Sequence, residues 1–223
     1  MTGLDRLVET ILSARARAPA EGALLVALSG IDGSGKSAIA RRLVAALRAG
    51  GTNTALIPLD PWHQPLEIRF SRDDPAEHFY RHAFRFDELF ERLVEPLCRQ
   101  RSVHLEVELT RLPENDRVVH TYDFRDVEVI VLEGIFLLKR ELSSRYDVAF
   151  WIECSFETAL RRALARNQEG LSEAEIRRDY ATIYFPAQRI HLERDDPTSR
   201  VDAVVDNERE WPSTRRPQGD GEA

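Results

Sequence analysis

The stretch Gly30-Ile31-Asp32-Gly33-Ser34-Gly35-Lys36-Ser37 decides the fold, because it matches the pattern GxxxxGK[ST] in full. Its glycines allow a tight turn whose backbone N–H groups point inward at phosphate oxygens. We expect Lys36 to reach the β- and γ-phosphates of a nucleotide and Ser37 to offer its hydroxyl to Mg²⁺. The expected phosphate cradle consists of Gly30, Asp32, Gly33, Ser34, Gly35, Lys36, Ser37 and Ala38.

The segments on either side of this stretch fit a strand and a helix. The apolar run Ala23–Leu28 is typical of a buried strand in a parallel sheet, and Ala38–Leu47 has helical periodicity. A second short strand is expected over Thr54–Leu59. Strand, loop, helix and strand in this order form a βαβ unit, which requires a parallel sheet.

Farther along the chain, apolar runs predict strands over Val127–Leu132, Asp147–Ile152 and Val201–Val205. A helix is expected from Leu4 to Ala16, and another from Phe86 to about Glu95, which Pro96 should end or kink. Alternating residues predict a half-exposed strand over Val103–Leu109, paired with Arg117–Thr121.

Two more helices are expected near the C-terminus, one from Ser155 to Arg166 and one that starts at Ser172 with Glu175 in a capping box. These elements predict an α/β fold of the P-loop NTPase type, a three-layer arrangement with a mainly parallel central sheet, helices on both faces and an Arg-containing lid. We expect a single domain over 1–207, a lid at about 161–190 and a flexible tail over 208–223.

Composition excludes several classes of protein. The chain has 223 residues, 43% of them hydrophobic and 31% charged, so disordered and fibrous classes are excluded. No stretch approaches the roughly 20 apolar residues of a membrane helix, and no secretory signal is evident, so we expect a cytoplasmic protein without a membrane partner. The net charge of −7 argues against nucleic acid as a partner. Cys98 and Cys154 form no CxxC pair, which argues against zinc.

The basic residues are unevenly divided, since the chain has only two lysines, Lys36 and Lys139, among 31 Lys and Arg residues. A chain that uses arginine almost everywhere else retains lysine within the phosphate cradle. This exception suggests that Lys36 has a task that arginine cannot perform.

Carboxylates follow two of the predicted strands. Ligands of open α/β sheets bind beyond the carboxyl ends of the parallel strands, and Asp60 and Glu133 stand at such ends. Phosphoryl transfer needs Mg²⁺ held by hydroxyl and carboxylate oxygens, and a group that orients the attacking oxygen. Ser37 and Glu133 are therefore the expected metal residues, and Asp60 the residue that orients the nucleophile.

Arginines and aromatic residues provide the remaining candidates. Arg162 and Arg166 lie four residues apart on one predicted helix and, with the nearby arginines 161, 177 and 178, could neutralise phosphate charge during transfer. Aromatic rings that could stack on a flat acceptor crowd the middle of the chain, where packing is their commoner role: Trp62, His63, His78, Tyr80, Phe84 and Tyr122.

Together these residues resemble the uridine kinase and phosphoribulokinase family of P-loop kinases, over about 24–207. The similar motifs are the phosphate loop, Leu59-Asp60-Pro61-Trp62-His63, Asp74-Pro75 through Phe86-Asp87, Tyr122-Asp123-Phe124, Val131-Leu132-Glu133-Gly134 and Val201 to Asn207. The resemblance implies that Asp60 is the general base and that Glu133 lies near Mg²⁺. It also implies that residues 161, 162 and 166 belong to a lid helix, that Tyr122 lies near the base of a nucleoside and that Phe84 lines the acceptor pocket.

The chain departs from the family at Arg85, where nucleoside-binding members have an aspartate that holds the ribose hydroxyls. An arginine cannot accept those hydrogen bonds and would favour an anionic acceptor. We therefore treat His63, Phe84, Arg85 and Tyr122, together with Asp60, as candidate acceptor residues. Uridine as the acceptor does not follow from the resemblance.

The sequence thus predicts a kinase that uses ATP and Mg²⁺ to phosphorylate a hydroxyl of a small, nucleoside-like acceptor. Three alternatives stay open: a kinase for a sugar-phosphate or pantothenate-like acceptor, a regulatory NTPase switch, and a binding protein that has lost activity. The sequence does not distinguish ATP from GTP, nor a monomer from a homo-oligomer.

Overall fold

The computed structural model describes residues 3–111, 116–167 and 170–209. Its helices are α1 Gly3–Arg17, α2 Lys36–Ala49, α3 Leu66–Arg69, α4 Pro75–His82, α5 Phe86–Leu89, α6 Glu95–Gln100, α7 Phe156–Arg166, α8 Glu173–Asp179 and α9 Phe185–Asp195. Its strands are β1 Leu24–Gly30, β2 Thr54–Pro58, β3 Val103–Arg111, β4 Asp116–Phe124, β5 Val129–Gly134, β6 Val148–Glu153 and β7 Ala203–Asp206. No helix in these ranges is both long enough and apolar enough to cross a membrane.

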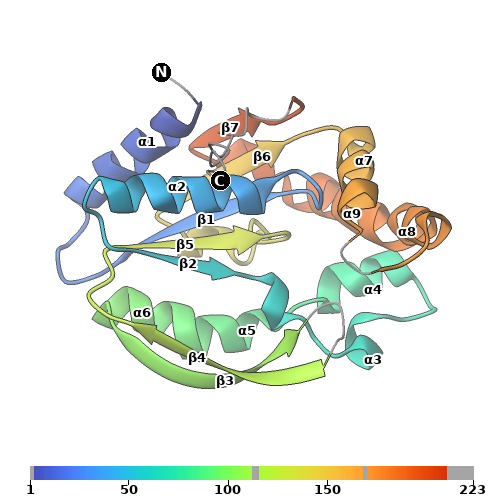
Figure 1. The fold of residues 1–223 in the computed structure, drawn as a ribbon, viewed down its shortest axis with the longest axis horizontal. Helices are drawn as coiled ribbons and strands as arrows, with labels where there is room; N and C mark the ends of the chain where they lie inside the picture. The colour runs from blue at the N-terminus through green and yellow to red at the C-terminus, as the bar shows by residue number, and fades with distance from the viewer. Residues whose placement is uncertain (1–2, 112–115, 168–169, 210–223) are drawn as a thin grey trace, which may run out of the picture.

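A five-stranded parallel sheet in the order β2-β5-β1-β6-β7 forms the middle layer, as the sequence predicted (Figure 1). Strand β1 is buried along its whole length and lies between β5 and β6. After β1 the chain continues to β2, which lies on one side of β1 in the sheet. After β5 it continues to β6, which lies on the other side of β1. The loop that follows β1 therefore lies at the switch point of the sheet, where open α/β folds bind ligands.

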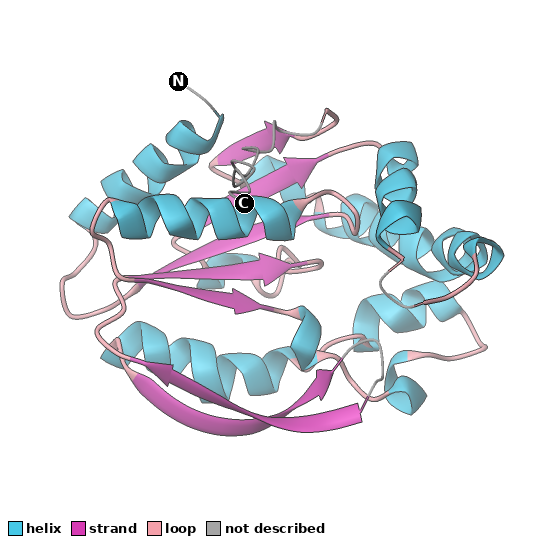
Figure 2. Cartoon of the chain, in the orientation of Figure 1, coloured by secondary structure: helices cyan, strands magenta, loops and turns pink. Residues whose placement is uncertain are grey.

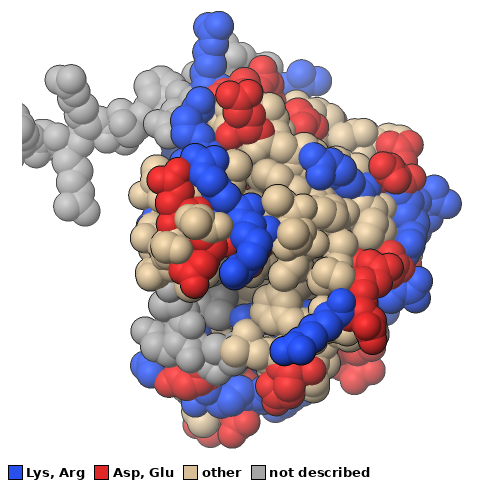
Figure 3. All heavy atoms as spheres, turned by 90° about the vertical axis from the view of Figure 1, so that its right-hand side faces the viewer, with Lys and Arg blue, Asp and Glu red and all other residues tan. Residues whose placement is uncertain are grey.

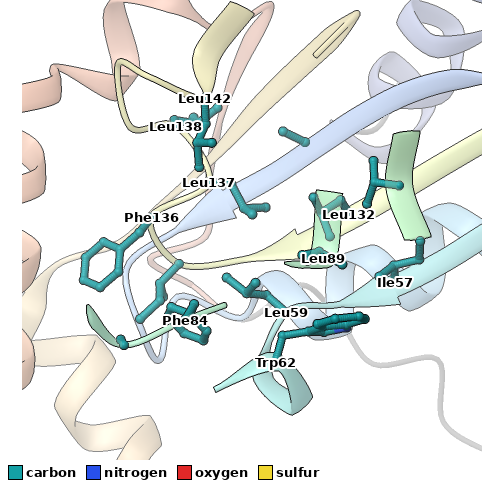
Figure 4. Packing of buried hydrophobic residues seen from close by; sticks show 14 of the residues in the cluster. Ile57, Leu59, Trp62, Phe84, Leu89, Leu132, Phe136, Leu137, Leu138 and Leu142 are labelled. Carbon is teal, nitrogen blue, oxygen red and sulfur yellow. The ribbon is translucent and has the colours of Figure 1, made fainter. Parts of the chain in front are cut away.

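Each face of the sheet has its own apolar core. Alternate β1 residues such as Val26 and Leu28 pack with α1 and α2, whereas Leu25 and Ala27 face the opposite core. That second core includes side chains from the helical segment at 86–100, and Figure 4 shows part of it around Leu132 and Phe136. The result is the predicted three-layer arrangement with helices on both faces (Figure 2).

The antiparallel hairpin of β3 and β4 lies outside the main sheet and curves past its β2 edge (Figure 1). Val103 pairs with Phe124 and Arg111 with Asp116, so the expected pairing of these two segments is confirmed. The hairpin turn at 112–115 lies outside the described residues.

Of the two outcomes expected at Pro96, the end of the preceding helix is wrong, because helical structure continues to Gln100. A π-helical turn at Phe90–Val94 precedes the proline, and the Glu95 amide donates to the Phe90 carbonyl. The wider turn accommodates the proline ring and its missing N–H. The same device recurs at Tyr180–Tyr184, directly before Phe185-Pro186, and extends the C-terminal helical segment to Asp195.

The other predicted elements near the C-terminus are present. Ser172 and Glu175 form the expected capping box at the start of α8. Most of the tail expected over 208–223 lies outside the described residues. Its first residue, Glu208, accepts hydrogen bonds from the Ser155 amide at 2.7 Å and the Thr158 hydroxyl at 2.6 Å, and so contacts the first turn of α7.

Candidate functional site

The loop between β1 and α2 has the shape that its glycines predicted. Gly33 and Gly35 adopt left-handed backbone conformations, with φ of 78° and 89°. A Cβ on Gly33 would lie 2.5 Å from the carbonyl oxygen of Ala159, and one on Gly35 would collide with the side-chain amide of Asn207. Only glycine fits these two positions, which leaves the inner side of the loop open to a ligand.

The cradle fits the phosphates of a nucleotide. Helix α2 starts at Lys36, so the N–H groups of its first turn, to which Ala38 belongs, face the loop. The Ser34 hydroxyl is buried and has no hydrogen-bond partner among the described residues. An open loop, a helix N-terminus and an unsatisfied buried hydroxyl are the features that an anionic ligand would complete.

Lys36 and Asp32 line one pocket together with Asp60, and we call it the phosphate-side pocket. The Lys36 side chain is only 7% exposed. The lining residues of this pocket include Phe79 of α4 and Gln188 of α9, and Figure 1 shows these two helices near the carboxyl ends of the parallel strands. Its remaining lining residues are His63, Arg69, Phe70, Ile135, Arg166 and Tyr184.

Ser37 and Glu133 meet at the floor of the site, as expected for a shared metal ligand set. The Ser37 hydroxyl donates to Glu133 Oε2 at 3.2 Å. Burial raises the pKa of the Glu133 carboxyl, although nearby Lys36 lowers it in part. A half-buried hydroxyl next to a buried carboxylate, beside a phosphate cradle, is a donor set that Mg²⁺ prefers, so these residues fit the ion.

Asp60 follows β2 directly and starts the short 3₁₀ turn Asp60–Trp62. The Leu59 amide donates to the Glu133 carbonyl at 2.8 Å, which fixes this turn beside the end of β5. Asp60 borders the phosphate-side pocket and also a second cavity under the β3–β4 hairpin, which we call the hairpin pocket. Asp60 is thus a lining residue of both cavities.

The hairpin pocket is largely apolar and contains Tyr122, His120 and Phe124. The Tyr122 hydroxyl accepts a hydrogen bond from Trp62 Nε1 at 3.2 Å. Burial raises the pKa of the Tyr122 hydroxyl. Trp62, labelled with Phe84 in Figure 4, belongs to the core beside the sheet. Tyr122 is therefore in position to contact a flat acceptor near Asp60.

Phe84 and Arg85 behave differently, although they are adjacent. Phe84 stacks on His63 with ring centroids 4.3 Å apart. Arg85 donates to Glu88 at 2.7 Å and to the Glu108 carbonyl at 2.8 Å, and it borders neither pocket that contains Asp60. Phe84 lines neither of these pockets either, so the structure brings neither residue to the two spaces beside Asp60, and their roles toward an acceptor stay predictions.

The two candidate arginines of α7 contact different parts of the loop. Arg162 donates to the Gly33 and Ser34 carbonyls at 3.4 and 3.3 Å and to the Asn207 carbonyl at 2.7 Å. Arg166 instead borders the phosphate-side pocket, with its Nη2 3.6 Å from Asp32 Oδ1. Arg162 therefore supports the loop, and Arg166 is the arginine of this pair that faces the ligand space.

Arg177 and Arg178, which also belong to the expected lid, form ion pairs within α8. Arg177 pairs with Glu173 at 2.6 Å and Arg178 with Asp179 at 2.9 Å, and all four belong to α8. On the molecular face turned to the viewer in Figure 3, basic and acidic side chains alternate around uncharged patches. Neither of these two arginines lines the phosphate-side pocket.

Three functional candidates escaped sequence reasoning. Arg69 is only 7% exposed and lines the phosphate-side pocket, although the stretch around it has no pattern beyond its charge and prolines. Gln188 Oε1 accepts the Asp32 amide at 2.9 Å, and Asn207 donates to the Ser34 carbonyl at 2.6 Å. Both reach the loop only through tertiary packing, which spacing in the sequence does not show.

Burial lowers the pKa of His63 to about 4, with Arg69 contributing and Asp60 opposing. The unfolded chain takes up a proton near pH 6.5, whereas the folded chain takes it up only near pH 4, so acidification favours unfolding. We expect His63→Gln to reduce the loss of unfolding free energy between pH 7 and pH 5 by about 2 kcal/mol. Urea denaturation at both pH values measures this difference.

The control for this prediction is His104→Gln, because the His104 side chain is 68% exposed. This variant should lose as much stability on acidification as the wild type. Equal losses in the wild type and in His63→Gln would contradict a buried, neutral His63.

Known proteins resemble this chain in sequence and in fold. A uridine kinase of Staphylococcus haemolyticus is 25% identical over 185 residues, which cover 81% of this chain and 86% of that enzyme. The fold is similar to that of a protein described as a possible uridine kinase from Bacillus stearothermophilus, with a TM-score of 0.71, 21% identity and coverage of 91% of this chain and 97% of that one.

A second solved structure, described as a candidate fructose transport system kinase from Silicibacter sp. TM1040, has a TM-score of 0.74 and 24% identity. It covers 95% of this chain and 100% of its own. No protein-family model matches the chain.

Proposed function

We propose that the chain is a member of the uridine kinase and phosphoribulokinase family of P-loop kinases, to which it is similar in sequence and fold, and that it transfers the γ-phosphoryl group of ATP to a hydroxyl of a nucleoside-like acceptor. The observation that carries this proposal is the phosphate-side pocket, where Lys36 and Asp60 line a single cavity. A cation for the phosphates and a base for the acceptor must lie on two sides of one space for direct transfer.

Each residue has a separate task in this reaction. The loop amides and Lys36 bind the phosphates, and Asp60 accepts the proton of the attacking hydroxyl. Ser37 and Glu133 would hold Mg²⁺, which supplies neutralisation of phosphate charge when bound. Arg166 adds positive charge from the lid side of the pocket, and Arg162 keeps the loop in shape.

The nucleoside-like acceptor is supported by the hairpin pocket. Its aromatic side chains offer apolar surface to a flat ring, while Asp60 at its border is within the same cavity. An acceptor hydroxyl at Asp60 and a ring near Tyr122 would fill both spaces. The curated relative named uridine kinase acts on an acceptor of this shape.

One observation favours a second acceptor class. Arg69 is buried at the acceptor side of the phosphate-side pocket, near Asp60 and His63. A buried guanidinium is well suited to a phosphate or carboxylate group. A sugar phosphate would place its hydroxyl at Asp60 and its anionic group at Arg69, a role that sequence reasoning had given to Arg85.

The experiment that tests the proposal is ADP release from Mg·ATP across nucleosides, ribosides, pantothenate and sugar phosphates, with Lys36→Ala as the blank. Acceptor-dependent release supports a kinase and identifies its acceptor class. Release that is equal with every acceptor and with none would favour the NTPase switch instead.

Two variants distinguish the acceptor classes. For an anionic acceptor, we expect Arg69→Gln to raise KM by roughly tenfold or more, because a charge-assisted contact is lost. For a nucleoside, Tyr122→Ala should raise KM by a similar factor through lost ring contact, and Arg69→Gln should have little effect. An unchanged KM for an anionic acceptor in Arg69→Gln would contradict the second candidate.

A further inference from the structure

Asp32 is a carboxylate inside the phosphate loop that contacts the elements of the expected lid. Its Oδ1 accepts the Gly33 amide at 2.9 Å and lies 3.6 Å from Arg166 Nη2 of α7. Its Oδ2 accepts the hydroxyl of Tyr180, from the π-helical turn after α8. The Asp32 amide in turn donates to Gln188 of α9. One loop residue therefore touches three successive parts of the segment 156–195.

A negative charge at Asp32 is unexpected, because this residue lines the pocket that a triphosphate would enter. Burial alone would raise the pKa of this carboxyl, but Lys36, Arg166 and the Tyr180 hydrogen bond lower it on balance. The group is therefore an anion at neutral pH. An anion in this place repels phosphate and competes with it for Arg166 and Lys36.

We propose that Asp32 is a positioning residue that holds Arg166 and Tyr180 at the loop in the absence of nucleotide and gives up Arg166 to the phosphates when nucleotide binds. This inference rests on the proposed function, since it assumes that the loop binds a nucleotide. The Asp32 carboxylate pairs with Arg166, the cation that a phosphate would otherwise bind. The contacts of Arg166 and Tyr180 with the loop would therefore form before the nucleotide binds.

The proposal fixes the sign of a binding change. Under this proposal Arg166 leaves Asp32 when the phosphates bind, so loss of the Asp32–Arg166 contact would destabilise only the nucleotide-free state. The variant without this contact must therefore bind nucleotide more tightly. A residue that only maintained the shape of the loop would have the opposite effect, because its removal would weaken binding.

The variant that tests this is Asp32→Asn, since the asparagine side-chain oxygen can still accept the Gly33 amide and its NH2 group can donate to the Tyr180 hydroxyl oxygen, while the charge is removed. We expect the Kd for Mg·ATP, measured by calorimetry, to fall by about threefold to tenfold. Amide hydrogen exchange in the last turn of α7, which carries Arg166, should become faster in the nucleotide-free variant and should match the wild type once Mg·ATP is bound.

Two further variants assign the effect to the right contact. Glu173→Gln removes an ion pair with Arg177 in α8 that lies outside the pocket, and it should leave the Kd unchanged. In an Arg166→Gln background, Asp32→Asn should tighten binding by less than it does in the wild type, because the partner has already gone.

Weaker or unchanged Mg·ATP binding by Asp32→Asn would overturn the inference, as would an undiminished effect in the Arg166→Gln background. If the wild type does not bind Mg·ATP at all, the proposed function fails and the inference fails with it. Tight binding by the wild type and weaker binding by Asp32→Asn would remove the inference and leave the proposed function intact.

Discussion

Replacement of Asp60 with alanine is expected to abolish phosphoryl transfer, which corresponds to a fall in kcat of roughly 10³-fold or more. Asp60 follows β2 directly and borders both the phosphate-side pocket and the hairpin pocket. Without its carboxylate, no group at this position accepts the proton of the attacking hydroxyl. Steady-state kinetics with the acceptor identified by the panel measure the effect.

The Kd for Mg·ATP should stay within about threefold of the wild-type value in Asp60→Ala, since Lys36 and the loop amides are unchanged. The control is Asp73→Ala, an exposed acid in the loop before α4. It should leave both kcat and Kd unchanged. Loss of nucleotide binding together with activity in Asp60→Ala would show that the carboxylate acts in metal binding or in the structure of the turn.

The central fold could be predicted because its signals are local. The inner strands β1 and β5 are buried along their whole length, so each appears in the sequence as a short apolar run, Leu24–Leu28 and Val129–Leu132. The phosphate loop requires glycine at two left-handed positions, and this constraint is visible in the sequence. Pro96 misled the prediction because a π-helical turn, which has no sequence signature, lets the helix continue.

The residues of the site likewise fall into those that local sequence signals identify and those that only tertiary packing brings in. Lys36, Asp60 and Glu133 stand at the carboxyl ends of neighbouring parallel strands, where topology alone brings them together. Arg69 and Gln188 reach the pocket only because α3 and α9 both pack against α4, so spacing could not identify them. Whether Arg85 faces the pocket could not be decided from the sequence, because this depends on its tertiary contacts, among them the hydrogen bond to Glu88 at 2.7 Å.

The second large effect is expected at Lys36. Lys36→Ala should lower kcat/KM for Mg·ATP by roughly 10³-fold, because it removes the buried cation that faces both the phosphates and the developing charge of the transferred group. It should also raise the pKa of Glu133, since Lys36 is the main group that lowers it. Kinetics and nucleotide binding by calorimetry measure the two parts of the loss. An unfolding midpoint close to that of the wild type is the control for folding.

Lys36→Arg gives the sharper version of this prediction. Most cations of this chain are arginines, and an arginine would keep the charge. The Lys36 side chain, however, is 7% exposed at the first residue of α2, between the loop and Glu133. A planar guanidinium is larger than an ammonium and needs a fixed fork of acceptors, which a phosphate moving during transfer does not provide. We therefore expect Lys36→Arg to lower kcat by about 10²-fold or more, whereas Arg99→Lys on the exposed side of α6 should have no effect. Activity of Lys36→Arg near the wild-type level would show that positive charge alone suffices at this position, and the retention of lysine there would need another explanation.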